Sequence, residues 1–263
     1  YDGIQQCNTV LYYANNGAAG NNVELRANEA KFLKAFYYYL LTQQIGGVPI
    51  SDEYIASVIT SFPRESQSAV YDYIINLLKE VEEANVLPSE DHTGRVSMKA
   101  VYNLLAKVYL AYGWDADVTA GATGLAEGQA ASASDKSKFA LAAQYADKAI
   151  AGKTPTMSFS DMWDVANDNN EDIFFAIQYT RGISGQDETT EGNQQMSHFS
   201  NYYNDDGDGA GLTKYTSSQF PVSEKLIYLF EPGDDRFEGT FMVEQPTEYK
   251  RFYTDADWKD QEI

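Results

Sequence analysis

Apolar residues recur every three or four positions through most of the first 155 residues, and this helical period is the strongest constraint on the fold. It predicts amphipathic helices at 2–15, 23–45, 66–85, 97–113 and 136–152. The helix at 23–45 has an apolar face too broad for one neighbour to cover. Because the helices also follow one another closely in the chain, the pattern predicts stacked, tetratricopeptide-like helical hairpins.

The pattern changes after residue 155. Residues 173–179 (IFFAIQY) are typical of a short buried strand, and 223–230 of a short helix. The stretch 180–218 has no helical period and is rich in Gly, Asn, Asp, Gln and aromatics. Connections that long without regular structure are usually functional or disordered. We therefore expect a mainly α fold in two parts: a helical region at 1–155, and an irregular, loop-rich region at 156–263 with a few short strands.

The net charge of −20, from 19 basic and 39 acidic residues, restricts the partners. Such a chain repels nucleic-acid phosphates and anionic lipid headgroups, so an uncharged ligand suits it better than an anionic one. The alternative is that the acidity only maintains solubility.

Few residue types that support catalysis or metal binding are available. Cys7 is the single cysteine and lies in an apolar helical pattern, so we expect a buried thiol. His92 and His198 are far apart, and no nucleophile elbow, phosphate loop or paired-histidine motif is present. We predict no catalysis, with a glycosidase as the alternative, because carboxylate pairs arise by chance among 39 acidic residues. No apolar stretch is long enough to span a membrane and no signal peptide is visible, so the chain is expected to begin inside a longer protein.

Four segments, in order, resemble the signatures of the SusD/RagB family. The first is a helix at 29–39 followed by the Gly-Gly-Val-Pro turn at 46–49. The others are 94–97 leading into 105–110, the 171–179 segment, and the Asp-Asp-Arg-Phe sequence at 234–237. Family members are usually near twice this length, and the lipid-bearing cysteine of the family is missing here. The resemblance therefore implies that the second part, 156–263, is a truncated ligand-binding region.

The resemblance implies a non-catalytic lipoprotein for polysaccharide utilisation on the outer face of a Gram-negative outer membrane. It would be anchored through a segment absent from this chain. Such proteins hold an oligosaccharide or polysaccharide, in some members a peptide, against a SusC-like TonB-dependent transporter. Their helices contact the transporter and loops on the opposite side contact the ligand. The alternative is a tetratricopeptide-like scaffold that binds only protein.

Glycan capture needs aromatic faces for sugar C–H surfaces and amides or carboxylates for hydroxyls. The richest such cluster lies at 196–215, where related proteins carry part of their sugar platform. The predicted ligand-binding residues are His198, Phe199, Tyr202, Tyr203, Asn204 and Tyr215. Alternatively, the tyrosines of this cluster only pin the loop to the core. Trp163 and Trp258 are further candidates, although Trp163 is expected in the core, and Tyr37 to Tyr39 are expected to pack.

The only cofactor that the sequence suggests is calcium. Asn204, Asp206 and Asp208, followed by Gly209, match the first half of an EF-hand loop. The twelfth position is Tyr215 rather than glutamate, and the alternative is a solvated acidic turn without metal.

Overall fold

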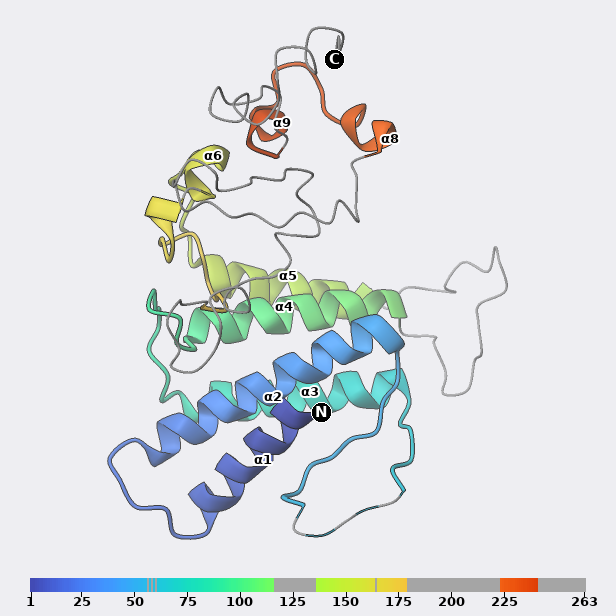
Figure 1. Cartoon of the computed structure of the whole chain (residues 1–263), viewed down its shortest axis with the longest axis vertical. Coiled ribbons are helices and arrows are strands. Elements are labelled where there is room, and N and C mark those ends of the chain that lie inside the picture. The colour runs from blue at the N-terminus through green and yellow to red at the C-terminus, as the bar shows by residue number, and fades with distance from the viewer. Residues whose placement is uncertain are drawn as a thin grey trace, which may run out of the picture. The chain divides into compact units, whose positions relative to one another are not determined.

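The computed structural model of the chain describes residues 1–55, 57, 59, 61–115, 136–163, 165–178 and 223–240 (Figure 1). The chain divides into two compact units, 1–155 with 171–176, and 156–170 with 177–263. The first unit contains the long helices α1 (Asp2–Asn15), α2 (Val23–Ile45), α3 (Gln67–Ala84), α4 (Met98–Asp115) and α5 (Lys136–Ile150). The predicted mainly helical fold is confirmed, and the described residues include no strand.

Local signals fix the ends of these helices. Gly46 ends α2 with a φ of 72°, and the side chain of Arg64 donates hydrogen bonds to the carbonyl oxygens of Ile45 and Gly47. Ser66 begins α3 because its hydroxyl accepts a hydrogen bond from the backbone N–H of Ala69, at 3.1 Å. The observed bounds of the five long helices lie within about two residues of the predicted ones, which is the usual precision of helix ends.

Each long helix packs mainly on its neighbours in sequence: α1 on α2, α2 on α3, α3 on α4 and α4 on α5 (Figure 1). This succession of helical hairpins is the arrangement that the tetratricopeptide-like prediction required. Within the described residues, no helix is both long and apolar enough to cross a lipid bilayer.

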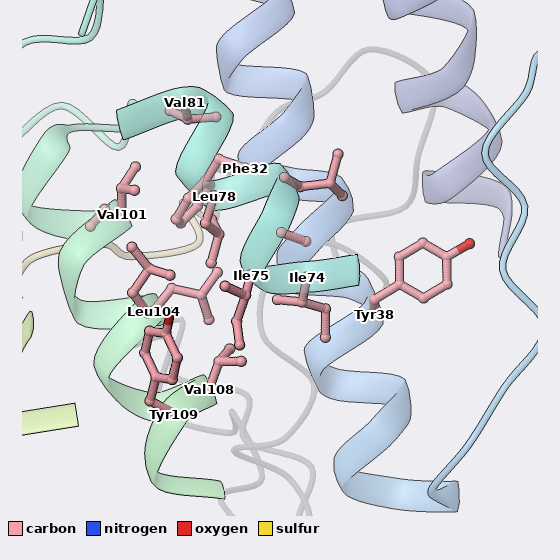
Figure 2. Packing of buried hydrophobic residues seen from close by; sticks show 14 of the residues in the cluster. Phe32, Tyr38, Ile74, Ile75, Leu78, Val81, Val101, Leu104, Val108 and Tyr109 are labelled. Carbon is pink, nitrogen blue, oxygen red and sulfur yellow. The ribbon is translucent and has the colours of Figure 1, made fainter. Parts of the chain in front are cut away.

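The core of the first unit lies between α2, α3 and α4 (Figure 2). In α3, Val70, Ile74, Leu77 and Val81 are all buried at steps of three or four residues, so this helix is amphipathic as predicted. In α2 the covered face is formed by Phe32, Lys34, Ala35, Tyr38 and Thr42, whereas Leu40 is exposed.

The prediction of a strand at 173–179 is wrong, because residues 173–178 form no strand. The ring of Phe175 instead packs against two α2 rings, 5.2 Å from Phe32 and 5.8 Å from Phe36 between centroids. A strand needs a neighbouring strand to receive its backbone hydrogen bonds, and the described residues supply none. Phe175 of this run therefore packs onto a helix, whereas Ile177 is exposed.

The described parts of the second unit are short. They are α6 (Phe159–Met162), a 3-10 turn η1 (Val165–Asn167), α8 (Glu224–Ile227) and α9 (Asp235–Thr240). Helices α6 and α9 pack against each other. The helix predicted near 223–230 is therefore present as the shorter α8.

Candidate functional site

The predicted ligand and calcium sites lie outside the described part of the chain, as does Trp258. They consist of the ligand-binding candidates His198, Phe199, Tyr202, Tyr203, Asn204 and Tyr215 and the calcium candidates Asn204, Asp206 and Asp208. The structure therefore leaves those assignments as predictions. A candidate site in the described part must be sought among exposed aromatic rings, because these are the groups that an uncharged glycan requires.

Three exposed tyrosines gather on the first unit, and we call them the tyrosine surface: Tyr12, Tyr13 and Tyr54. The rings of Tyr12 and Tyr54 stack, with centroids 4.8 Å apart and planes 26° apart. Tyr13 stands edge-on to Tyr12 at 5.4 Å and 6.4 Å from Tyr54. The residues are 44%, 54% and 39% exposed, so water-accessible ring surface remains after they have packed on one another.

The position of Tyr12 and Tyr13 follows from the packing of α1. Ile4 and Cys7 are the buried apolar residues of this helix, which packs on α2, and both tyrosines fall outside their stripe. The turn after α1 fixes the helix end, since Asn16 donates to the carbonyl oxygen of Tyr12 at 2.7 Å. Sequence reasoning missed these tyrosines, although two adjacent aromatics outside a helix's apolar stripe are a signal that could have found them.

Tyr54 is brought to α1 by the preceding residues 51–53, which we call the anchor segment. Gln5 of α1 donates to the hydroxyl of Ser51 at 2.6 Å. The Asn8 amide donates to the carbonyl oxygens of Ser51 and Glu53, both at 3.0 Å. Side chains of α1 therefore hydrogen-bond to the residues just before Tyr54, and the ring of Tyr12, from the same helix, stacks on the ring of Tyr54.

Helices α2 and α3 hold the anchor segment from other directions. The Lys34 ammonium lies 2.6 Å from the Asp52 carboxylate, which also accepts a hydrogen bond from Tyr73. The Ser51 backbone N–H donates to the Tyr38 hydroxyl at 2.7 Å. Figure 2 shows the Tyr38 ring directed away from the labelled core side chains of α3 and α4, so its hydroxyl is free to reach Ser51.

The ionisation of these groups reflects the same contacts. Partial burial raises the pKa of Asp52, but the hydrogen bonds from Lys34 and Tyr73 outweigh burial and hold this pKa below its ordinary value. Burial raises the pKa of Tyr38 to about 12. Burial, followed by the hydrogen bond to Asp52, also raises the pKa of Tyr73. At neutral pH Asp52 of the anchor segment is thus ionised, while Tyr38 and Tyr73, which hold the segment, are neutral.

Other aromatic residues differ partly from expectation. Trp163, expected in the core, is 67% exposed and contacts the Phe159 ring edge-on at 6.1 Å. Of the three consecutive tyrosines in α2, Tyr38 is buried and Tyr39 packs on the core. Tyr37 is 37% exposed and lies over Gly3 of α1. All three tyrosines of this triplet therefore pack as expected, although Tyr37 keeps part of its ring exposed.

Among the described residues, no group of three or more His, Cys, Asp or Glu side chains is placed to hold a metal ion. Cys7 is buried as predicted, and burial raises the pKa of its thiol to about 11. A buried thiol with a raised pKa is a poor nucleophile.

Comparison with known proteins gives a consistent result. Residues 1–110 match the SusD-like family model described as starch-binding and associating with the outer membrane. A SusD superfamily protein from Parabacteroides distasonis is 26% identical with a TM-score of 0.69, over 90% of this chain and 46% of that one. Surface glycan-binding protein A from Bacteroides uniformis is 21% identical with a TM-score of 0.67, over 97% of this chain and 51% of that one. A structure solved with a xylogluco-oligosaccharide is 22% identical with a TM-score of 0.58, over 77% of this chain and 38% of that one. The comparison with curated proteins found no match.

The fold and the exposed rings define a helical-hairpin protein with a surface suited to binding. Its first 110 residues match the SusD-like family model, and its fold is that of a SusD superfamily protein. It spans 46% of the length of the Parabacteroides distasonis protein and 51% of the length of the Bacteroides uniformis protein.

Proposed function

We propose that this chain binds uncharged oligosaccharides or polysaccharides, without cleaving them, at the surface of the outer membrane. The observation that carries the proposal is the tyrosine surface, in which stacked rings stay exposed on a SusD-like helical unit. Soluble proteins seldom leave several large rings together in water without a binding role. The family description and the xylogluco-oligosaccharide bound to a structural relative support a glycan as the ligand.

The chemistry of the surface fits a neutral sugar. The faces of Tyr12, Tyr13 and Tyr54 can cover the apolar C–H faces of pyranose rings, and their hydroxyls can hydrogen-bond to sugar hydroxyls. The net charge of −20 penalises a polyanionic chain such as a uronic-acid polymer. Neutral glycans are therefore the ligand class that the surface favours.

The rest of the proposed function rests on the family resemblance and on residues outside those described. A second ligand contact would lie at 196–215, through Phe199, Tyr202, Tyr203 and Tyr215 with His198 and Asn204. The intact protein would be lipid-anchored at the extracellular face and pass its glycan to a SusC-like transporter. The match to a family that associates with the outer membrane supports this location.

Isothermal titration calorimetry with maltoheptaose and a xylogluco-oligosaccharide tests the proposal. We expect Tyr54→Ala to weaken binding about tenfold, equivalent to roughly 1.4 kcal/mol. Tyr54→Phe keeps the ring face and should stay within about threefold of wild type. An oligogalacturonate of equal length serves as the charged control and should bind more weakly than either neutral probe.

Other outcomes would point to the alternatives. No binding across a broad panel of glycans, together with capture of a protein or peptide, would favour the scaffold or the peptide-binding interpretation. Release of reducing sugar by the purified chain would favour a glycosidase. Unchanged affinity after alanine substitution of Tyr202, Tyr203 and Tyr215 would remove the contact proposed at 196–215.

A further inference from the structure

We propose that Lys34 is a positioning residue for glycan binding: its buried ammonium holds the anchor segment so that Tyr54 stays stacked on Tyr12. The inference rests on the proposed function of the tyrosine surface and adds a residue that does not itself contact the ligand.

The environment of Lys34 is unusual for a lysine. Its side chain is 0% exposed, whereas lysines are almost never fully buried unless they are paired. Its ammonium lies 2.6 Å from the Asp52 carboxylate and donates to the Asp52 carbonyl oxygen at 3.3 Å. It also lies 5.5 Å from the centre of the Tyr73 ring. Both hydrogen bonds from one buried cation thus end on the same residue of the anchor segment.

Folding stability alone does not account for this arrangement. The carboxylate partner is 62% exposed, and ion pairs with such partners contribute little to stability. Burying the ammonium of Lys34, in contrast, has a desolvation cost. A buried cation that adds little net stability is better explained by the position it imposes on its partner.

That position matters for Tyr54. Asp52 is held from α2 and α3 by Lys34 and Tyr73, while Ser51 is held by Tyr38. Tyr54 follows the anchor segment by one residue and stacks on Tyr12. A ring already held in place loses less conformational freedom when a sugar binds, and such preorganisation appears directly as affinity.

The chain offers a matched control on the same helix. Lys31 of α2 forms an ion pair of the same length, 2.6 Å, with Glu80 of α3, and its side chain is 27% exposed. Lys31→Met and Lys34→Met therefore remove the same group from the same helix, but only the second releases Asp52. Methionine keeps an unbranched apolar stem in the core, so Lys34→Met should fold.

Two measurements on the full chain separate positioning from general destabilisation. Hydrogen–deuterium exchange of peptides covering 49–55 reports how firmly the anchor segment is held. Calorimetry with maltoheptaose and the xylogluco-oligosaccharide reports the consequence for binding. For Lys34→Met we expect about tenfold faster exchange and about fivefold weaker binding, with the melting temperature within about 2 °C of wild type. Lys31→Met should leave both exchange and binding at wild-type values.

The outcomes discriminate between the two proposals. Wild-type exchange at 49–55 in Lys34→Met would overturn the role of Lys34, and so would wild-type affinity in that variant. Equal losses in Lys31→Met and Lys34→Met would also overturn it, because the effect would then follow from general loosening of α2. If the wild-type chain binds neither probe, the proposed function fails, whatever the exchange of Lys34→Met shows.

Discussion

The guanidinium of Arg95 forms two hydrogen bonds with the carboxylate of Glu29, a residue of α2 that lies 66 positions earlier in the chain. Arg26 contacts the same carboxylate at 2.6 Å. Burial raises the pKa of Glu29, and the positive charge of Arg26 opposes this rise. Glu29 and Arg95 belong to two of the segments that carry the family resemblance. This pair therefore links α2 to the segment before α4, and it is not part of the tyrosine surface.

Breaking this pair should destabilise the first unit. We expect Arg95→Met to lower the free energy of unfolding by about 1–2 kcal/mol, since Glu29 is buried but keeps Arg26 as a partner. Urea unfolding followed by far-ultraviolet circular dichroism measures this change. In a double-mutant cycle with Glu29→Gln, a coupling energy near zero would contradict the assigned interaction.

Gly47 should not tolerate any side chain. A Cβ atom there would lie 2.2 Å from the carbonyl oxygen of Glu65, a backbone atom that cannot swing aside. We expect Gly47→Ala to cost about 3 kcal/mol or to prevent folding. In Gly3→Ala the new Cβ would meet only the far end of the half-exposed Tyr37 ring, so this control should cost about 1 kcal/mol or less. Thermal unfolding of both variants makes the comparison, and equal losses would contradict the backbone clash.

Glu90 should make stability depend on pH in the acidic range. Lys99 lies 2.7 Å and Lys153 2.9 Å from its carboxylate, and these two ammonium groups lower the pKa of Glu90 to about 2. Because the folded pKa is below the ordinary value, the stabilisation is present above pH 4 to 5 and is lost as the pH falls toward 2. Glu90→Gln should therefore melt lower than wild type at pH 7 and lose less of its melting temperature on acidification.

The control for this experiment is Glu83→Gln on the exposed side of α3. It should follow the wild-type curve between pH 7 and pH 2. A Glu90→Gln curve parallel to wild type throughout that range would contradict the lowered pKa of Glu90.

Calcium binding at 204–209 can be tested directly. If Asn204, Asp206 and Asp208 hold the ion, calorimetry should detect one site, and EDTA should lower the melting temperature. The double variant Asp206→Asn with Asp208→Asn removes two anionic ligands and should abolish the binding heat. An identical titration of wild type and variant would favour the solvated acidic turn.

The sequence by itself determined the helical frame. The apolar period and local stop signals such as Gly46 and Ser66 act within a few residues, so the bounds of α1 to α5 could be deduced without knowing which segments meet. The same local pattern was misleading at 173–178, where an apolar run typical of a strand packs Phe175 on α2.

Only the tertiary structure decided which residues face water and which meet. Lys34 would be placed on the surface by its charge, yet it is buried because Asp52, from the segment after α2, comes back to pair with it. Nothing in the sequence indicates that Tyr12 and Tyr54 meet. They form a surface because α1 and the anchor segment pack together. The physical reason is that helical period is a property of neighbouring residues, whereas the pairing of distant side chains depends on how completed helices pack.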